Sequence, residues 1–264
     1  MENKKQLLPE EMSEFYFEFQ AVMGITKHMG GLRATEELIK LCSINKDKYV
    51  LDVGCGLGRT VCYIAKRHGC RAVGADISER MVDRSRERAK KESVEDRVEF
   101  RVGDALNLPF EDATFDAVIE ESVTAFVRDK QRAVNEYVRV TKPGGFVGLN
   151  ECNWIKAPPP GLAEYMFRIM GAKFPAPDGW KEVLEGSGLR DVVARTYKIR
   201  ALDQLANEIR QLDFREHLRA WCKFLFLLIK SPACRRFSKE ALSMPKNIFD
   251  IFKYFGYGIY FGRK

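Results

Sequence analysis

Three closely spaced glycines and one more distant acid have the spacing of a nucleotide-binding site. Gly54, Gly56 and Gly58 follow the β-branched and aliphatic run 49–53, which is typical of a buried strand. Glycine has no Cβ, so the backbone of such a turn can approach a ligand closely where the next helix begins. Asp76 lies about eighteen positions beyond the last glycine. At that distance an α/β fold places a carboxylate against ribose hydroxyls; the alternative is a solvated acid at a helix entry.

Four further acids follow expected strands later in the chain. They are Asp104 after 98–102, Glu120 and Glu121 after 115–119, and Glu151 after 146–150. Because ligands enter an open α/β sheet at the carboxyl ends of its strands, we expect these acids at that edge. Of these acids, Glu120, Glu121 and Glu151 would form a cluster that could hold a cationic or amine-bearing group, with Trp154 and Tyr16 adding cation–π contacts. The alternatives are an Asx turn at Asp104 and acids that face solvent or bind a cofactor.

The apolar pattern predicts the scaffold that these residues need. Strands are expected at the runs 49–53, 71–76, 98–102, 115–119 and 146–150, and helices at 32–42, 79–92 and 132–140. Ser78 is the expected N-cap of the helix 79–92, and 142–145 is the expected turn into the fifth strand. Strands that alternate with helices in this way form right-handed parallel crossovers, and therefore a doubly wound sheet.

Beyond Glu151 the pattern changes. We expect short helices at 162–170 and from 179, a sixth strand at 188–197, and a seventh strand at 256–262 that returns to the sheet. The predicted fold class is α/β, with six parallel strands, an antiparallel last strand, an N-terminal helical cover and a helical insertion before the last strand. The expected divisions are 1–45 for the cover, 46–200 for the core, 201–254 for the basic insertion or lid, and 255–264 for the final strand.

The net charge of +7 is concentrated in the last quarter of the 264 residues, where 201–264 holds twelve Lys and Arg against six Asp and Glu. Phenylalanines lie among these basic residues. Three interpretations stay open: a lid over the active site, a homodimer surface, or a peripheral membrane contact. No nucleic-acid-binding motif accompanies the charge, so a nucleic-acid partner is not expected.

Seven cysteines without a CxxC spacing predict neither a disulfide framework nor a zinc ribbon. The first residues lack the apolar core of a signal peptide, and the apolar run 224–229 is far shorter than the roughly 20 residues that span a bilayer. The sequence therefore predicts a soluble, cytoplasmic protein with reduced thiols, and leaves peripheral association with a membrane open.

The glycine pattern differs from that of dinucleotide enzymes. Their fingerprint is G-x-G-x-x-G, whereas this chain has G-x-G-x-G followed by Arg59, which disfavours a nicotinamide or flavin cofactor. The ordered motifs VLDVGCGLG, VGADIS, VGDALNLPF, FDAVIEES and VTKPGGFV resemble the class I S-adenosylmethionine-dependent methyltransferases over about residues 25–151. This resemblance implies a Rossmann-like core. The segment 28–35 is similar to the approach in small-molecule members, including phosphoethanolamine, sterol and quinone methyltransferases.

The resemblance implies that the earlier motifs bind the methionyl and ribose parts of S-adenosyl-L-methionine. Asp52 would orient the glycine loop and the methionine ammonium, and the backbone of the three glycines would approach the ligand. Cys55 would be a small filler in the turn beside the cofactor. Asp76 would accept both ribose hydroxyls, which suits a carboxylate because it has no donor to leave unpaired.

The later motifs are implied to bind the adenine and the ammonium. Ile77 would cover one adenine face, Asp104 would accept from the exocyclic amine, and the backbone of Ala105 would meet a ring nitrogen. Glu120 occupies the position whose backbone carbonyl usually holds the methionine ammonium in this family. No metal is required in this scheme.

The resulting hypothesis is in-line methyl transfer to a small-molecule or lipid-like acceptor of amine, quinone or isoprenoid type, leaving S-adenosyl-L-homocysteine. The protein would mainly align the reacting atoms and exclude water. A general base is needed only for a protonated acceptor, and His28, Tyr16 and Glu121 are the candidates; for His28, capping or packing is the alternative.

The sequence leaves two alternatives to methyl transfer. One is a non-catalytic regulatory or interaction protein that binds S-adenosylmethionine or S-adenosylhomocysteine. The other is thiol-assisted methylation of a metalloid by Cys55, Cys152 and Cys222, which is disfavoured because these cysteines lie in the wrong sequence contexts.

Overall fold

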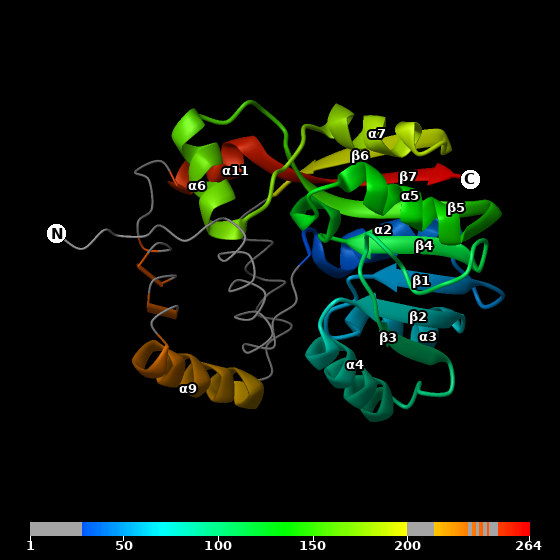
Figure 1. Cartoon of the computed structure of the whole chain (residues 1–264), viewed down its shortest axis with the longest axis horizontal. Helices are drawn as coiled ribbons and strands as arrows, with labels where there is room; N and C mark the ends of the chain where they lie inside the picture. The colour runs from blue at the N-terminus through cyan, green and yellow to red at the C-terminus, as the bar shows by residue number, and fades with distance from the viewer. Residues whose placement is uncertain (1–27, 200–213, 232–233, 236–237, 240–241, 243–247) are drawn as a thin grey trace.

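The core of the molecule is one twisted sheet with helices on both faces (Figure 1). The computed structural model describes residues 28–199, 214–231, 234–235, 238–239, 242 and 248–264. Of the expected N-terminal helical cover, 1–45, residues 1–27 lie outside the described residues, including the aromatic-rich part of 10–29.

Seven strands form this sheet in the order β3-β2-β1-β4-β5-β7-β6. They are β1 (Tyr49–Val53), β2 (Arg71–Asp76), β3 (Val98–Val102), β4 (Phe115–Glu121), β5 (Thr141–Trp154), β6 (Arg190–Lys198) and β7 (Phe255–Arg263). The strands β1 to β5 pair in parallel, and β7 is antiparallel to both of its neighbours, β5 and β6. The predicted fold class, six parallel strands with an antiparallel last strand, is confirmed.

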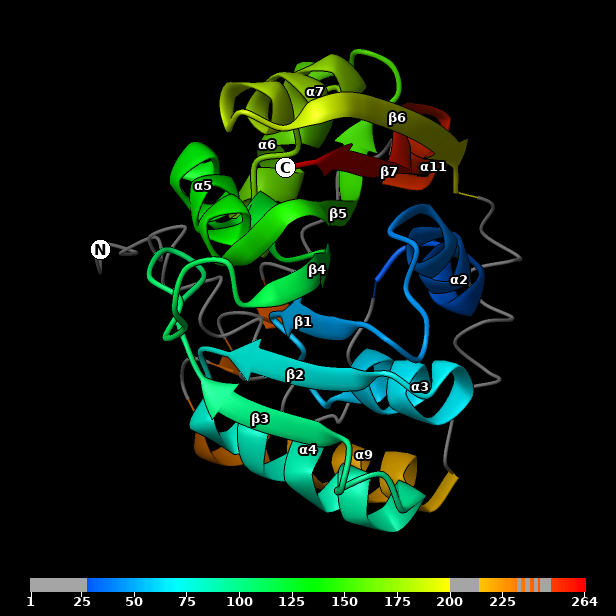
Figure 2. The same ribbon diagram turned by 90° about the vertical axis from the view of Figure 1, so that its right-hand side faces the viewer.

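The helices divide into two sets because successive strand residues face opposite sides of the sheet. The helices are α2 (Gly31–Leu41), α3 (Arg59–His68), α4 (Glu79–Glu92), α5 (Lys130–Val140), α6 (Pro160–Met170), α7 (Pro177–Gly186), α9 (Phe214–Lys230) and α11 (Ile251–Tyr254), with 3-10 turns η1 (Thr124–Phe126) and η2 (Ile248–Asp250). On β1, Val50 packs with α2, α3 and α4, whereas Leu51 packs with α5, α6 and α7. Figure 2 shows α2 and α3 on one side of the sheet and α5 on the other.

Local sequence signals fix several helix starts. Ser78 is the N-cap of α4 as predicted, and its hydroxyl accepts the Met81 N–H at 3.4 Å. The buried face of α4 is formed by Met81, Val82, Ser85 and Ala89. In α5 the carboxylate of Asp129 accepts the Arg132 N–H at 2.9 Å, so this helix begins two residues before the expected start.

The expected turn at 142–145 was wrong, because β5 begins at Thr141 and runs without interruption to Trp154. Thr141 pairs with Phe115 of β4, after which the register shifts before the pairing continues. Gly144 and Gly145 exchange backbone hydrogen bonds with Lys264 at 2.9 and 3.0 Å. The glycines therefore form an irregular part of a strand, because a distant segment supplies the hydrogen-bond partners that a turn would have supplied locally.

The parallel strands point toward α6, α9 and α11, which lie beyond their carboxyl ends (Figure 1). The ends of β5 and β7 meet there, with Trp154 paired to Phe255. Among the described residues, no helix is long and apolar enough to cross a bilayer.

Candidate functional site

The glycine loop between β1 and α3 can be formed only by glycine. The three loop glycines have φ of 70°, 54° and 67°, where side chains with a Cβ are strained. A Cβ on Gly54 would lie 2.3 Å from Cγ2 of Val123, and the Gly54 N–H donates to the carbonyl of Ala75 at 2.7 Å. The loop is thus packed against the end of β4 and fastened to the end of β2.

Asp76 at the end of β2 links the glycine loop to the start of α4. One carboxylate oxygen accepts the Gly56 N–H and the other accepts the Ser78 N–H, both at 2.9 Å. Burial raises the pKa of Asp76, and these two N–H donors oppose the rise. The carboxylate therefore has a fixed plane, and each oxygen retains a lone pair for a further donor.

An apolar side chain and an exposed loop lie next to this acid. Ile77 is 75% exposed although it directly follows a buried strand, so its side chain is available to cover a flat apolar group. Asp104 is exposed, and its Oδ1 accepts the Leu106 N–H at 2.9 Å, which is the Asx turn anticipated as the alternative. Ala105, the next residue, is buried.

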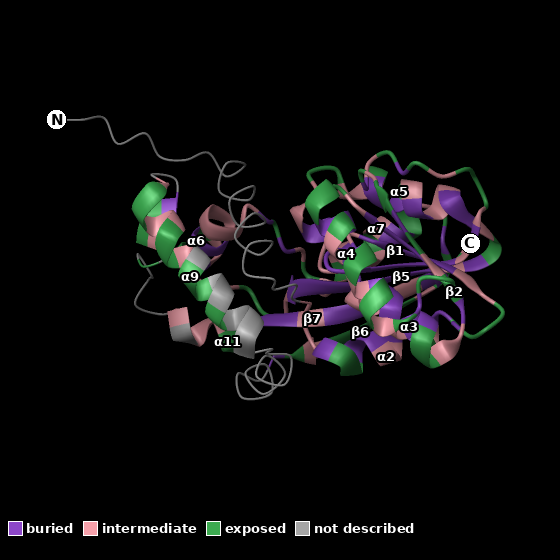
Figure 3. Ribbon diagram, turned by 90° about the horizontal axis from the view of Figure 1, so that it is seen from below, coloured by how far each residue is buried: buried purple, intermediate pink, exposed green. Residues whose placement is uncertain are grey.

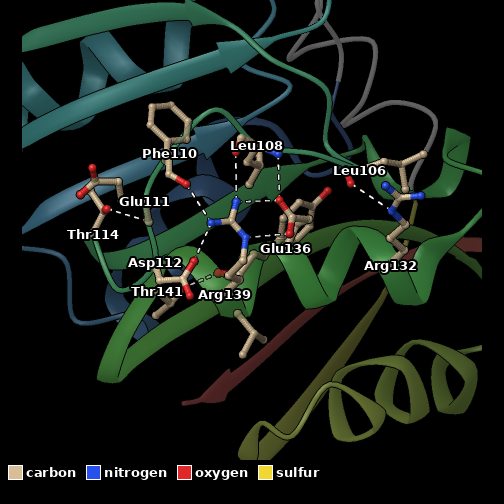
Figure 4. A network of polar contacts seen from close by, with 12 residues as sticks. Leu106, Leu108, Phe110, Glu111, Asp112, Thr114, Arg132, Glu136, Arg139 and Thr141 are labelled. Atoms are coloured by element: carbon tan, nitrogen blue, oxygen red, sulfur yellow. Dashed lines mark hydrogen bonds and ion pairs between the residues drawn. The ribbon is translucent and has the colours of Figure 1, made fainter.

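Arg139 of α5 holds the segment 108–112, which follows Asp104 and Ala105 in the chain (Figure 4). Its guanidinium donates to the backbone carbonyls of Leu108 at 3.0 Å and Phe110 at 2.8 Å. It also pairs with the carboxylates of Glu136 at 2.7 Å and Asp112 at 2.8 Å. A lysine has no planar fork with which to contact all four groups, so this position requires arginine.

Glu121, at the carboxyl end of β4, accepts hydrogen bonds from three elements. The hydroxyl of Thr35 in α2 lies 3.0 Å from Oε2, that of Thr60 in α3 lies 2.9 Å from Oε1, and the amide of Asn150 in β5 lies 3.1 Å from Oε2. The side chain is only 5% exposed, and Nδ1 of His28 lies 3.1 Å from Oε2. Glu121 therefore connects His28, which precedes α2, to the first turn of α3, directly after the glycine loop.

The contacts of Asn150 determine which nitrogen of His28 carries the proton. Nδ2 of Asn150 donates to the carbonyl of Met29 at 3.0 Å and to Glu121 at 3.1 Å, which uses both of its hydrogens. The reverse orientation of the amide is excluded, because it would turn the carbonyl oxygen, which cannot donate, toward these two acceptors. Nδ2 therefore has no hydrogen left for Nδ1 of His28, 3.4 Å away, and Nδ1 must donate its own proton to Glu121. In a neutral imidazole this leaves Nε2 as a proton acceptor.

Glu120 and Glu151 form a buried pair on neighbouring strands, and both side chains are 0% exposed. Oε2 of Glu120 accepts the Val123 N–H at 2.9 Å, and Oε1 of Glu151 accepts the Ala125 N–H at 2.8 Å. Burial raises the pKa of both carboxyls, that of Glu151 to about 7, and the negative Glu151 raises the pKa of Glu120 further. Two buried carboxylates this close cannot both ionise easily, so the pair retains a proton and fixes the turn η1.

Asp52 is also buried, with 3% of its surface exposed. Its pKa is raised first by burial and then by the negative charges of Glu121 and Asp76, so these three acids lie within electrostatic range of one another around the loop. Cys55 and Cys152 are buried too, and burial raises the pKa of both thiols. Neither is an activated thiolate, which weighs further against thiol-assisted chemistry.

The structure thus brings two of the three predicted base candidates, His28 and Glu121, into direct contact. Tyr16, the third, lies outside the described residues. Sequence reasoning missed Thr35, Thr60 and Asn150 as partners of Glu121. The signal available for two of them was position, since Thr60 follows the glycine loop and Asn150 ends the expected fifth strand.

Comparisons with known proteins agree with this geometry. A family described as "Methyltransferase domain" matches residues 51–149, which run from β1 into β5. An uncharacterised protein of Haemophilus influenzae is 31% identical over 179 residues, covering 66% of this chain and 71% of that protein. The chain belongs to the class I S-adenosylmethionine-dependent methyltransferases. This methyltransferase is an enzyme that uses S-adenosylmethionine as its methyl donor.

The named relatives of this methyltransferase are matched over only part of their length. Phosphoethanolamine N-methyltransferase 1 of Arabidopsis thaliana is 28% identical over 185 residues, which are 70% of this chain but 37% of the plant protein. The crystal structure of the [4+2]-cyclase SpnF superimposes with a TM-score of 0.71 at 19% identity, covering 96% of this chain and 94% of that one. That likeness concerns the fold alone.

Proposed function

We propose that this methyltransferase holds S-adenosyl-L-methionine across the glycine loop, with Asp76 accepting the ribose hydroxyls. The observation that carries the proposal is the fixed carboxylate plane, with one N–H donor already on each oxygen of Asp76. Loop glycines at positive φ, two of which leave no room for a Cβ, and the exposed side chain of Ile77 support the same cradle. When bound, the cofactor supplies a methyl group that its sulfonium makes strongly electrophilic.

The other expected contacts complete this proposed site. Asp52 stays the candidate for orienting the loop, and Asp104 and the Ala105 N–H stay the candidates for the adenine. The side chain of Glu120 is buried and accepts the N–H groups of Val123 and Thr124, so its backbone carbonyl stays the candidate for the ammonium. These contacts, with the carboxylate of Asp76, are what supports the cofactor site proposed here.

Calorimetric titration with S-adenosylmethionine tests the cofactor site. Asp76→Ala should weaken binding by at least about thirtyfold, since it removes two charge-assisted hydrogen bonds and releases the loop. Asp83→Ala is the matched control, because Asp83 is exposed on α4 and pairs only with Arg86. Equal affinity of wild type and Asp76→Ala would contradict the assignment of this acid.

We further propose that the acceptor is an apolar, lipid-like molecule of isoprenoid or quinone type and not a small free amine. The described acids at the strand ends cannot form an open anionic cage, because Glu120, Glu121 and Glu151 are buried and bound by protein donors. An aromatic cluster lies at the end of β5, where Phe255 lies 5.0 Å from Trp154 and 4.9 Å from Phe174 between ring centroids. Phe174 and Phe255 are buried in the core, and the half-buried Trp154 is the member that can contact an apolar acceptor.

Methyl transfer from labelled cofactor to a panel of acceptors tests this specificity. Quinone precursors, prenyl diphosphates and phospholipids should accept label, and phosphoethanolamine and glycine should not. Trp154→Ala should raise the KM of the apolar acceptor about tenfold and leave the Kd of S-adenosylmethionine unchanged. Label found only in the soluble amines would overturn the acceptor class and leave the cofactor proposal standing.

For an acceptor that carries a proton, we propose His28 as the general base, oriented by Glu121. The contact of Nδ1 with Glu121 directs the lone pair of Nε2 away from this carboxylate. His28→Ala should lower kcat by about a hundredfold without changing cofactor affinity, whereas the control His68→Ala, on α3, should change neither. A raised KM with an unchanged kcat in His28→Ala would show that the residue only packs.

A further inference from the structure

The helix α9 carries a stripe of large apolar side chains that face solvent. Its exposed residues recur at helical spacing and lie on one face: Leu218 at 58%, Trp221 at 52%, Leu225 at 54%, Phe226 at 59% and Ile229 at 75% exposed. Figures 1 and 3 agree that α9 lies apart from the sheet, beyond the carboxyl ends of its parallel strands. A helix that only lined the core would present such a stripe to the protein.

The same segment carries nearly all of the net charge of the protein. Residues 214–254 contain nine Lys and Arg against three Asp and Glu, whereas the remaining chain is close to neutral. Lys230 at the end of α9 is exposed, and Arg235 donates to the carbonyls of Leu228 and Ile229 in its last turn. Lys239 and Leu242, later in the same segment, are exposed too.

From these two observations we propose that α9 docks this protein on the surface of an anionic lipid bilayer. A helix of 17 residues is about 25 Å long, and no described helix can cross a membrane, so α9 lies in the plane of the interface with its stripe among the acyl chains. The basic residues meet the anionic headgroups, each contributing about 1 kcal/mol near the surface. Tryptophan is a side chain suited to this depth.

This docking goes beyond methyl transfer and is independent of the acceptor proposal. Because α9 lies beyond the same end of the sheet as the cofactor cradle (Figure 1), docking through α9 brings that end of the molecule toward the bilayer. An apolar acceptor dissolved in that bilayer would then reach the site without crossing water. Failure of the acceptor panel would leave the docking untouched, since vesicle binding is measured without any acceptor.

Flotation with vesicles tests the docking, using the full chain at 50 mM NaCl and phosphatidylcholine vesicles with or without 30% phosphatidylserine. We expect the wild type to float with the anionic vesicles, and to be released at least about tenfold by 0.5 M NaCl. Leu225→Glu combined with Ile229→Glu should reduce flotation at least about tenfold. Val193→Glu, which changes an exposed apolar residue of β6, is the matched control and should float like the wild type.

Further measurements separate loss of docking from loss of the fold. The double variant should keep the S-adenosylmethionine affinity of the wild type, and the milder Phe226→Ser should show an intermediate loss of flotation. Wild type that stays at the bottom with anionic vesicles overturns the proposal, as does equal flotation on neutral vesicles. Equal flotation of the double variant overturns it too. If the wild type is a dimer that does not float and the double variant is a monomer, the docking proposal is overturned and the stripe is instead a contact between two copies of the chain.

Discussion

The substitution Glu120→Gln tests whether the buried pair of Glu120 and Glu151 retains a proton. The folded protein raises the pKa of Glu151 from 4.5 to about 7, because burial disfavours its charge. The unfolded chain gives up that proton near pH 4.5, so unfolding releases a proton at intermediate pH. The free energy of unfolding must therefore fall as pH rises from about 4.5 to about 7.

The pKa of Glu151 sets a lower bound on this effect, because the pKa of Glu120 is raised as well. One pKa unit corresponds to 1.36 kcal/mol, so the rise to about 7 costs about 3 kcal/mol of stability at pH 8 relative to pH 4.5. In Glu120→Gln the amide oxygen can accept the Val123 N–H, and the amide nitrogen can donate to Glu151 as the retained proton does. The substitution removes the raised pKa of Glu120 and leaves Glu151 buried, so the variant should be more stable than the wild type by at least about 1 kcal/mol at pH 8 and equal to it near pH 5.

Urea unfolding followed by tryptophan fluorescence at pH 5, 6, 7 and 8 measures both curves. The difference between wild type and variant isolates the pair, because the other titrating groups are shared. Glu111→Gln, on the exposed surface, should leave the curve of the wild type unchanged. A wild-type stability that is constant or rises over this range, or a variant destabilised at pH 8, would refute the reasoning.

Two further predictions concern the cradle. Gly54→Ala should destabilise the fold by about 3 kcal/mol or more, because the new Cβ meets Val123. Gly188 also has a positive φ but open space around it, so Gly188→Ala should cost only about 1 kcal/mol. Equal costs of the two variants in thermal unfolding would mean that the contact with Val123 is unimportant. Arg139→Lys should lower stability by about 1–2 kcal/mol and weaken S-adenosylmethionine binding by freeing the loop that Glu136 helps to hold. Calorimetry showing unchanged affinity would separate that loop from the cofactor.

The sequence predicted those parts of the fold that depend on neighbours along the chain. The strands at 49–53, 71–76 and 98–102 and the helix at 79–92 have the predicted bounds, because alternation, glycine turns and the Ser78 cap are local signals. The turn at 142–145 was wrong because Lys264 pairs with it.

The contacts within the candidate site could not be predicted in the same way. Glu121 is 86 residues from Thr35 and 61 from Thr60, and no local pattern records such a contact. The pairing of Glu120 with Glu151 likewise depends on the register of two strands and on their complete burial. Position at a strand end identified all three acids as candidates, but only the fold assigned their partners.

The insertion of β7 between β5 and β6 has a consequence for synthesis. Within the described sheet β6 pairs only with β7, yet β6 ends at Lys198 and β7 begins at Phe255. On the ribosome, β6 therefore emerges without a partner, and β5 keeps an open edge until the intervening segment has been translated. A nascent chain that stops before residue 255 lacks both β7 and the pairing of β6 with the sheet. We therefore expect the sheet to be completed late, and the chain to require a chaperone until β7 has been translated.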